Sequence, residues 1–290
     1  MSKYLNYIGI AAILLYVSMW LLYLFDAANA FILIGVLLVL LLFLVIVLII
    51  YRNANVRIIR ISTILLIIFL IFDLKLLHYE SITYHVSIFA SPVEVVEESG
   101  IHLMVVNSTD IEYIEDKNLI LDSFKNENKD VLNLQKIDNT FRYKSKNGEL
   151  VSWILKREDE FSKMVDNINS YLAGNTTSID EFLKRKDLSG DSAGLGLALS
   201  ALIAEGELLN NKTIGITGAL KPNGDVLPIG MVEEKVRIAE KKRFPYIIVP
   251  SDNAKEANQV KQSRNLNIEI FDVNHIDQAV TLIQKLNAVN

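Results

Sequence analysis

The chain has 290 residues, 51% of them hydrophobic, and its mean hydropathy of +0.30 is too high for an ordinary water-soluble domain. The net charge of −5 provides no basic surface for nucleic acid, and the lack of cysteine excludes disulfides, cysteine catalysis and thiolate metal sites. The four histidines are scattered along the sequence, so we expect no metal and no other cofactor.

The first 79 residues form a predicted membrane region. Each of its three apolar segments can form a helix long enough to cross a hydrocarbon core of roughly 30 Å. A cleaved signal peptide is the alternative for the first segment, and an interfacial helix is the alternative for the third, because Asp73 and Lys75 lie near its end. The predicted transmembrane helices cover residues 4–25, 27–51 and 61–77.

Loop charges predict the topology. Arg52, Arg57 and Arg60 lie between the second and third segments, whereas the first loop carries only Asp26. Arginine-rich loops stay in the cytoplasm, so three spans place everything after about residue 79 outside it. We therefore predict a multi-pass protein of the cell membrane with an extracytoplasmic catalytic domain. With only two spans, that domain would be cytoplasmic.

Residues 80–177 form the N-terminal part of the soluble region. Their pattern predicts strands at 81–90 and 101–106, a polar loop at 108–133, and an amphipathic helix at 158–173. A turn signal at Lys146-Asn147-Gly148 between two β-prone runs predicts a β-hairpin over 140–155.

The most informative stretch begins at Gly190-Asp191-Ser192-Ala193-Gly194. The following run, through Ala204, is apolar nearly all round and predicts a buried helix with Ser192 at its N-terminus. Free N–H groups collect there, and an acyl-transfer nucleophile needs such donors for its oxyanion. A helix cap is the alternative role for this serine.

A lysine lies on the inward face of a second predicted helix, from Met231 to Arg243. Val232, Val236 and Ala239 mark its buried stripe, and Lys235 lies beside them. An apolar setting would lower the pKa of the amine toward neutral pH, which a general base requires. A lysine that reaches out to solvent is the alternative.

Together these motifs resemble the proteolytic domain of Lon-type proteases, the Ser-Lys dyad peptidases. The shared pattern comprises Ser-Ala-Gly after a glycine turn, Thr217-Gly218, the run Gly224–Gly230, and Lys235. The resemblance implies that Ser192 is the nucleophile, Lys235 its base and Thr217 the residue that orients the lysine. We also expect Gly190, Asp191 and Ala193 to support the serine.

Three positions depart from the family pattern. Asp191 stands where the family usually has proline, and Met231 where it usually has a second glycine. Ala219 replaces an acidic residue that bacterial Lon enzymes carry two positions after the threonine.

The remainder of the catalytic region, residues 178–290, alternates predicted strands and helices, which indicates an α/β fold. The predicted elements are strands at 246–249 and 268–271 and helices at 254–262 and 276–286. The resemblance implies the ribosomal protein S5 domain 2-like fold of the Lon peptidase, and a homo-oligomer, commonly a hexameric ring.

We therefore predict a membrane-anchored serine endopeptidase that cleaves flexible peptides or unfolded protein segments. The chain has no Gly-x4-Gly-Lys-Ser/Thr phosphate loop, so the predicted activity is independent of ATP. One alternative is an α/β-hydrolase esterase with a strand at 182–188 before the serine and His275 as its base. The other is a non-enzymatic membrane adaptor or sensor with a degenerate Lon-like domain, suggested by Asp191 and Met231.

Overall fold

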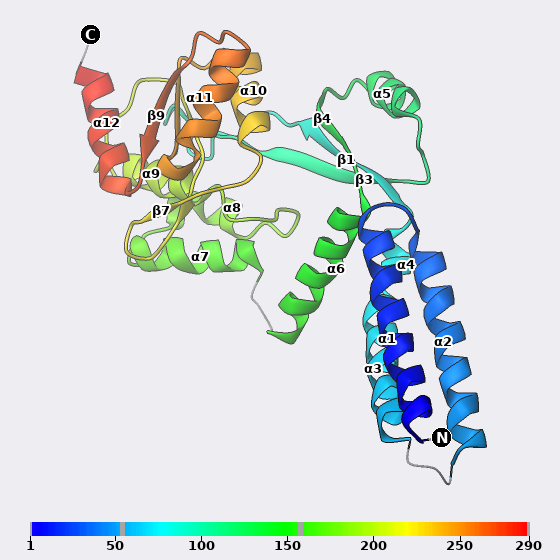
Figure 1. The fold of residues 1–290 in the computed structure, drawn as a ribbon. Helices are drawn as coiled ribbons and strands as arrows, with labels where there is room; N and C mark the ends of the chain where they lie inside the picture. The colour runs from blue at the N-terminus through cyan, green and yellow to red at the C-terminus, as the bar shows by residue number, and fades with distance from the viewer. Residues whose placement is uncertain (1, 53–55, 156–158, 289–290) are drawn as a thin grey trace. The chain divides into compact units, whose positions relative to one another are not determined.

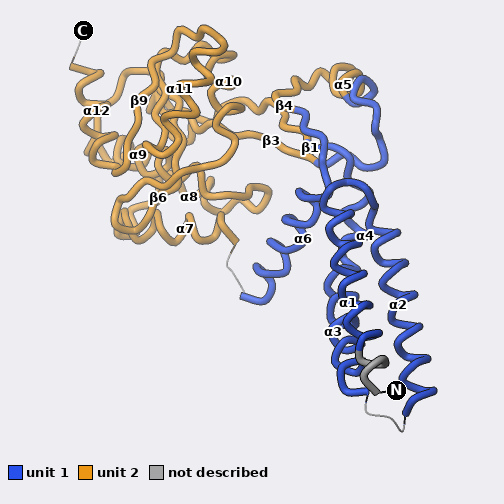
Figure 2. The backbone as a smooth tube through the Cα atoms, viewed as in Figure 1, with its two compact units in different colours: residues 1–85, 110–120, 134–157 blue, residues 86–109, 121–133, 158–290 orange. Residues whose placement is uncertain are grey.

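The computed structural model describes residues 2–52, 56–155 and 159–288, and it divides the chain into two compact units (Figure 2). Unit 1 comprises residues 1–85, 110–120 and 134–157, and unit 2 comprises residues 86–109, 121–133 and 158–290. The chain therefore passes from one unit to the other several times.

Unit 1 is built on three helices that pack against one another (Figure 1), namely α1 (Ser2–Leu24), α2 (Ala30–Ile50) and α3 (Arg57–Asp73). Residues 7–24 of α1 and all of α2 are long and apolar enough to cross a membrane, by length and composition. Core helices of soluble proteins and signal sequences can share these two properties. The third predicted span, 61–77, does not form one helix, because α3 ends at Asp73 and residues 76–77 begin the short helix α4 (Leu76–Tyr79). Its crossing of a membrane stays a prediction.

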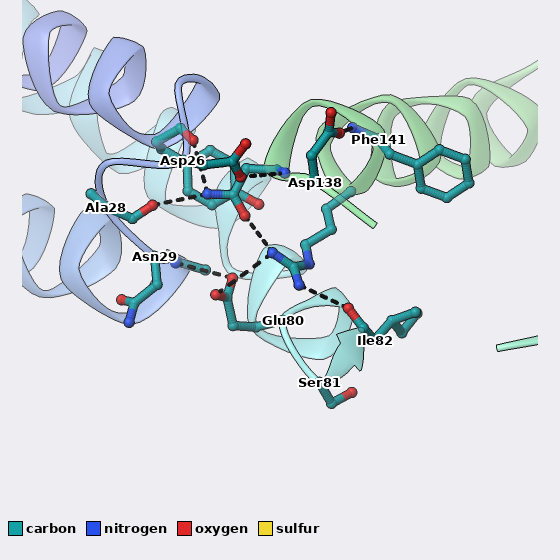
Figure 3. Close-up of polar contacts among 12 residues, drawn as sticks. Asp26, Ala28, Asn29, Glu80, Ser81, Ile82, Asp138 and Phe141 are labelled. Atoms are coloured by element: carbon teal, nitrogen blue, oxygen red, sulfur yellow. Dashed lines mark hydrogen bonds and ion pairs between the residues drawn. The ribbon is translucent and has the colours of Figure 1, made fainter. Parts of the chain in front are cut away.

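The predicted hairpin at 140–155 is wrong, because these residues belong to helix α6 (Asn139–Ile154). The Asp138 side chain caps this helix by accepting a hydrogen bond of 2.7 Å from the backbone N–H of Phe141. The backbone N–H of Asn139 donates to Asp26, and its side chain donates to the carbonyl oxygens of Tyr23 and Ala28, so α6 begins at the loop between α1 and α2 (Figure 3).

A second polar cluster attaches α6 to the helix bundle. Lys146 Nζ donates to Asp73 Oδ1 over 2.7 Å, and Tyr16 donates to the other carboxylate oxygen over 2.7 Å. The lysine that signalled a turn in the sequence thus belongs to a fully buried ion pair. This tertiary contact outweighs the local turn signal, because breaking a buried pair would leave a charge without its partner.

Strands β1 (Ile82–Phe89), β3 (Val106–Glu112) and β4 (Val131–Lys136) form a sheet in the order β3-β1-β4. The predicted strand at 81–90 is confirmed. The single strand predicted at 101–106 is instead β2 (Ile101–Leu103) followed by β3. The predicted polar loop at 108–133 is wrong, since it contains most of β3, helix α5 (Lys117–Asn126) and the start of β4.

Unit 2 contains a parallel sheet in the order β2-β5-β8-β9, with helices on both faces. Ile248 of β8 packs with α9 and α12, whereas its neighbours Ile247 and Val249 pack with α10 and α11. This alternation is that of a strand buried on both faces. The elements are β5 (Ile214–Ile216), β8 (Tyr246–Pro250), β9 (Glu269–Val273), α9 (Gly194–Ala204), α10 (Val232–Lys242), α11 (Ala254–Ser263) and α12 (Ile276–Ala288).

These elements confirm the helices predicted after Ser192 and around Lys235, and the four elements predicted after them. The amphipathic helix predicted at 158–173 is α7 (Glu160–Tyr171), with its apolar side chains packed in the core. Shorter elements complete the unit, namely α8 (Asp180–Leu183), β6 (Ala219–Leu220), β7 (Val226–Leu227) and two 3-10 turns at Thr177–Ile179 and Ser251–Asn253.

Candidate active site

Ser192 lies just before α9, in the turn that leads into this helix. Gly190 has a φ of +81°, a conformation that side chains disfavour, so a glycine is needed to turn the chain there. Residues 194–201 of α9 are all buried. The predicted buried helix with Ser192 at its N-terminal end is thus confirmed, and the serine itself is partly exposed.

Thr217 follows the buried strand β5 and is held against the serine turn. The backbone N–H of Gly218 donates to the Ser192 carbonyl over 2.8 Å, and Leu195 donates back to the Gly218 carbonyl over 2.9 Å. The Thr217 hydroxyl also donates to the Ser192 carbonyl, over 3.2 Å. These contacts fix the serine turn to the end of the central strand.

Lys235 completes the arrangement from the first turns of α10. Its side chain is only 5% exposed, and its Nζ donates to Thr217 Oγ1 over 2.9 Å. The structure therefore connects the lysine to the serine residue through Thr217. Among the described residues, no hydrogen bond directly joins the Ser192 hydroxyl to the Lys235 amine.

Burial lowers the pKa of Lys235 from 10.5 to about 8, while the carboxylates of Asp191 and Glu234 oppose this shift. A buried ammonium is costly, and Thr217 supplies a neutral oxygen rather than a compensating charge. A considerable fraction of the amine is therefore unprotonated in mildly alkaline solution, which is the state able to accept a proton.

The three departures from the family pattern have distinct structural settings. Asp191 lies one residue before the serine, and its charge favours protonated Lys235. Met231 has a φ of +58° and lies immediately before α10, so a methionine adopts the left-handed conformation that a glycine adopts freely. Ala219 is buried in β6.

Two supporting contacts were not evident in the sequence. The Asn253 side chain accepts a hydrogen bond of 2.8 Å from the backbone N–H of Ile229 and donates one of 3.1 Å to its carbonyl oxygen. These two bonds fix the turn before α10. Asn133, at the unit 2 end of β4, donates to buried Glu234 over 3.0 Å. Asn133 and Glu234 are 101 positions apart, and the sequence around neither residue indicates that they form a hydrogen bond.

The esterase alternative required a strand at 182–188 that leads into the serine turn. These residues instead contain the end of α8 and irregular chain. His275, its proposed base, has its Nε2 3.0 Å from the carbonyl oxygen of Asn223. The structure does not support a nucleophile elbow of the α/β-hydrolase kind.

Comparison with known proteins finds a similarity over the segment that carries these residues. Residues 185–285 match the family model of the Lon protease (S16) C-terminal proteolytic domain. The chain is 34% identical to the Lon protease of Desulforamulus reducens over 99 residues, which is 33% of this chain. It is 32% identical to that of Brevibacillus choshinensis and 30% identical to that of Rickettsia typhi, each over 91 residues, or 31% of this chain.

Each of these alignments covers 12% of the relative, so the chain spans only a small part of the length of these Lon proteases. The class to which residues 185–285 are similar is the serine peptidases of the Lon type. This similarity confirms the resemblance seen in the sequence and supports serine peptidase activity.

Proposed function

We propose that this protein is a membrane-anchored, ATP-independent serine endopeptidase that uses a Ser192–Lys235 dyad. The observation that carries the proposal is the buried Lys235 amine, which has a pKa of about 8 and is hydrogen-bonded to Thr217 beside the Ser192 turn. Without a phosphate loop in the sequence, the proposed substrates are flexible peptides or unfolded segments, which need no motor to open them.

In the proposed reaction, neutral Lys235 accepts the proton of the Ser192 hydroxyl as the serine oxygen attacks a peptide carbonyl. Backbone N–H groups around Ser192 and Ala193, at the N-terminal end of α9, hold the resulting oxyanion. Protonated Lys235 then gives its proton to the departing amine. Water, deprotonated by the same lysine, attacks the acyl-enzyme, and the proton returns to Ser192 as the carboxylic acid product leaves.

The test compares the full chain in detergent micelles with Ser192→Ala and Lys235→Met variants, using casein as an unfolded substrate from pH 6 to 10. Wild-type cleavage should rise with pH, with a midpoint near the pKa of about 8, because the neutral lysine is the active form. Each variant should lose at least about 1,000-fold in kcat/KM, since each removes a member of the nucleophile–base pair.

Cleavage that survives in the Lys235→Met variant would show that the base is another group. A folded and assembled wild type that cleaves neither casein nor short peptides would favour the adaptor or sensor alternative. The size of the assembly, measured in the same micelles, tests the hexameric ring suggested by the family.

The proposed anchoring can be tested by labelling single introduced cysteines. The sequence has no cysteine of its own, so no other thiol in the chain reacts. Lys255→Cys and Arg52→Cys place single thiols at exposed positions after and before the third helix. With three spans, a membrane-impermeant maleimide added to intact cells should label Lys255→Cys and leave Arg52→Cys unlabelled. Protection of Lys255→Cys, with labelling only after lysis, would place the catalytic domain in the cytoplasm.

A further inference from the structure

Helix α10 carries the proposed base, and one side of this helix packs on the parallel sheet. The apolar stripe of Val232, Val236 and Ala239 lies in one cluster with side chains of β8. At roughly 100° per residue, Lys235 projects from the flank of this stripe rather than from its centre. A rotation of α10 on the sheet would therefore move the lysine amine away from Thr217.

The opposite side of α10 is covered by residues 130–133, which also belong to unit 2. Positions 234, 237 and 241 follow the three- and four-residue spacing of a single helix face, roughly 180° from the apolar stripe. Each of these positions contacts the covering segment. The contacts are Glu234 with the side chain of Asn133 over 3.0 Å, Arg237 with the carbonyl oxygen of Leu132, and Lys241 with Asp130.

The contact of Glu234 depends most on its geometry. The side chains of Lys241 and Asp130 are 44% and 62% exposed, and an ion pair so open to solvent contributes little. Glu234 is only 6% exposed, although a glutamate on the face opposite the core is normally in water. Because a buried carboxylate is costly without a hydrogen bond, the amide of Asn133 favours one position of the helix over others.

We propose that Asn133 is a positioning residue for the peptidase reaction. By holding Glu234 it fixes the rotation of α10, and with it the place of the Lys235 amine beside Thr217. The inference rests on the proposed role of Lys235 as the base. It extends the working part of the peptidase to a residue outside the segment 185–285 that matches the family model.

The first variant removes the amide and keeps every charge. Asn133 is exposed, so Asn133→Leu removes the donor without opening a cavity, and the two carboxylates that act on Lys235, those of Asp191 and Glu234, both remain. In the casein assay with the full chain in micelles, kcat should fall roughly 10-fold and KM should change less than about twofold, because a displaced base slows the chemical step.

The pH profile separates positioning from mere stabilisation of the fold. In Asn133→Leu its midpoint should rise by about half a pH unit or more, since a less firmly held Lys235 is better solvated. Gln135→Leu, at an exposed position on the same face of β4, is the matched control and should change neither the midpoint nor kcat. A lower kcat with the wild-type midpoint would show that Asn133 only stabilises the fold, and would overturn the positioning role.

A reversed pair tests whether the hydrogen bond itself is responsible. Asn133→Asp places a second carboxylate against Glu234 and should reduce kcat at least as much as Asn133→Leu. Adding Glu234→Gln restores a hydrogen bond with donor and acceptor exchanged, and should recover most of the lost activity. Failure of the double variant to recover, when it is as stable as wild type, would contradict the proposal.

Two further results separate this inference from the proposed dyad. Cleavage that survives in Lys235→Met overturns both, whereas an inactive Lys235→Met beside an unaffected Asn133→Leu overturns this inference alone. If the wild type cleaves nothing, NMR of the full chain with isotope-labelled lysine still decides. The resonance missing from Lys235→Met belongs to Lys235, and its titration should give a pKa of about 8 in wild type and a higher one in Asn133→Leu. Equal values would exclude the positioning role.

Discussion

Each compact unit of the chain buries a lysine, and the two lysines have opposite surroundings. Lys146 in unit 1 meets the Asp73 carboxylate and lies within 4.3 Å of the ring centres of Phe72 and Tyr143. Lys235 in unit 2 is hydrogen-bonded to a neutral threonine hydroxyl. Burial lowers the pKa of both amines, but only Lys146 has a hydrogen-bonded anion to counter the effect. The partner therefore decides whether a buried lysine is structural or available as a base.

The largest expected effect comes from removing the lysine that has an anionic partner. Lys146→Met leaves the buried Asp73 carboxylate without its cation and should cost about 3–5 kcal/mol of unfolding free energy. Adding Asp73→Asn to this variant should recover most of the loss. Thermal unfolding in detergent, followed by circular dichroism, measures both. If exposed Lys144→Met is equally costly, the ion pair does not hold α6 in place.

Removing the other lysine should raise the free energy of unfolding rather than lower it. The pKa of Lys235 is lower in the folded chain than its usual 10.5, so the unfolded chain binds more protons between about pH 8 and 10.5. At pH 7, Lys235→Met should therefore stabilise unit 2 by up to about 3 kcal/mol, although activity is lost. This gain should shrink above pH 8 and vanish near 10.5. A gain that is constant with pH would argue that packing, not desolvation of the amine, is responsible.

A smaller effect should follow from removing the negative charge nearest to the serine in sequence. The Asp191 carboxylate raises the pKa of Lys235, so Asp191→Asn should move the midpoint of the pH–activity profile to lower pH, by up to about one unit. Glu234→Gln should act in the same direction and more weakly. Exposed Glu233→Gln serves as the control, and an equal shift in that variant would show that neither carboxylate acts locally.

The smallest expected effect concerns the backbone before α10. Met231 has a φ of +58°, so Met231→Gly should relieve strain and stabilise unit 2 by about 1 kcal/mol. Arg243→Gly, at the other end of α10 with a φ of +55°, offers a matched comparison. Chemical denaturation measures both gains. A loss of stability in Met231→Gly would mean that the methionine side chain contributes packing that outweighs the strain.

The sequence predicted correctly those helices whose spacing of apolar residues matches the face that is buried in the structure. The stripe of Val232, Val236 and Ala239 placed Lys235 inside unit 2, and the structure finds it buried there. The apolar run after Ser192 likewise predicted α9. Both signals are local, because a helix repeats every 3.6 residues whatever surrounds it.

The failures involve partners distant in sequence. The turn signal at Lys146 favoured a hairpin, but Asp138 caps a helix there and Lys146 pairs with Asp73, 73 positions earlier. The bond from Asn133 to Glu234 is equally invisible, although it holds the helix that carries the proposed base. A single sequence does not say which distant polar groups will pair, and tertiary contacts of this kind can override a local signal.

The short strand β2 bears on where this peptidase module begins. Residues 101–103 form the edge of the parallel sheet next to β5, and Leu103 packs so closely on α9 that a β-carbon at Gly196 would lie 2.3 Å from it. Yet the recognisable family segment starts only at residue 185. A fragment that begins there would lack β2, so β5 would become an edge strand with unpaired backbone groups, and α9 would lose the cover of Leu103. The segment that carries the family likeness is therefore shorter than the sheet that supports it, and we expect a graft of residues 185–285 alone to transfer the chemistry without that support.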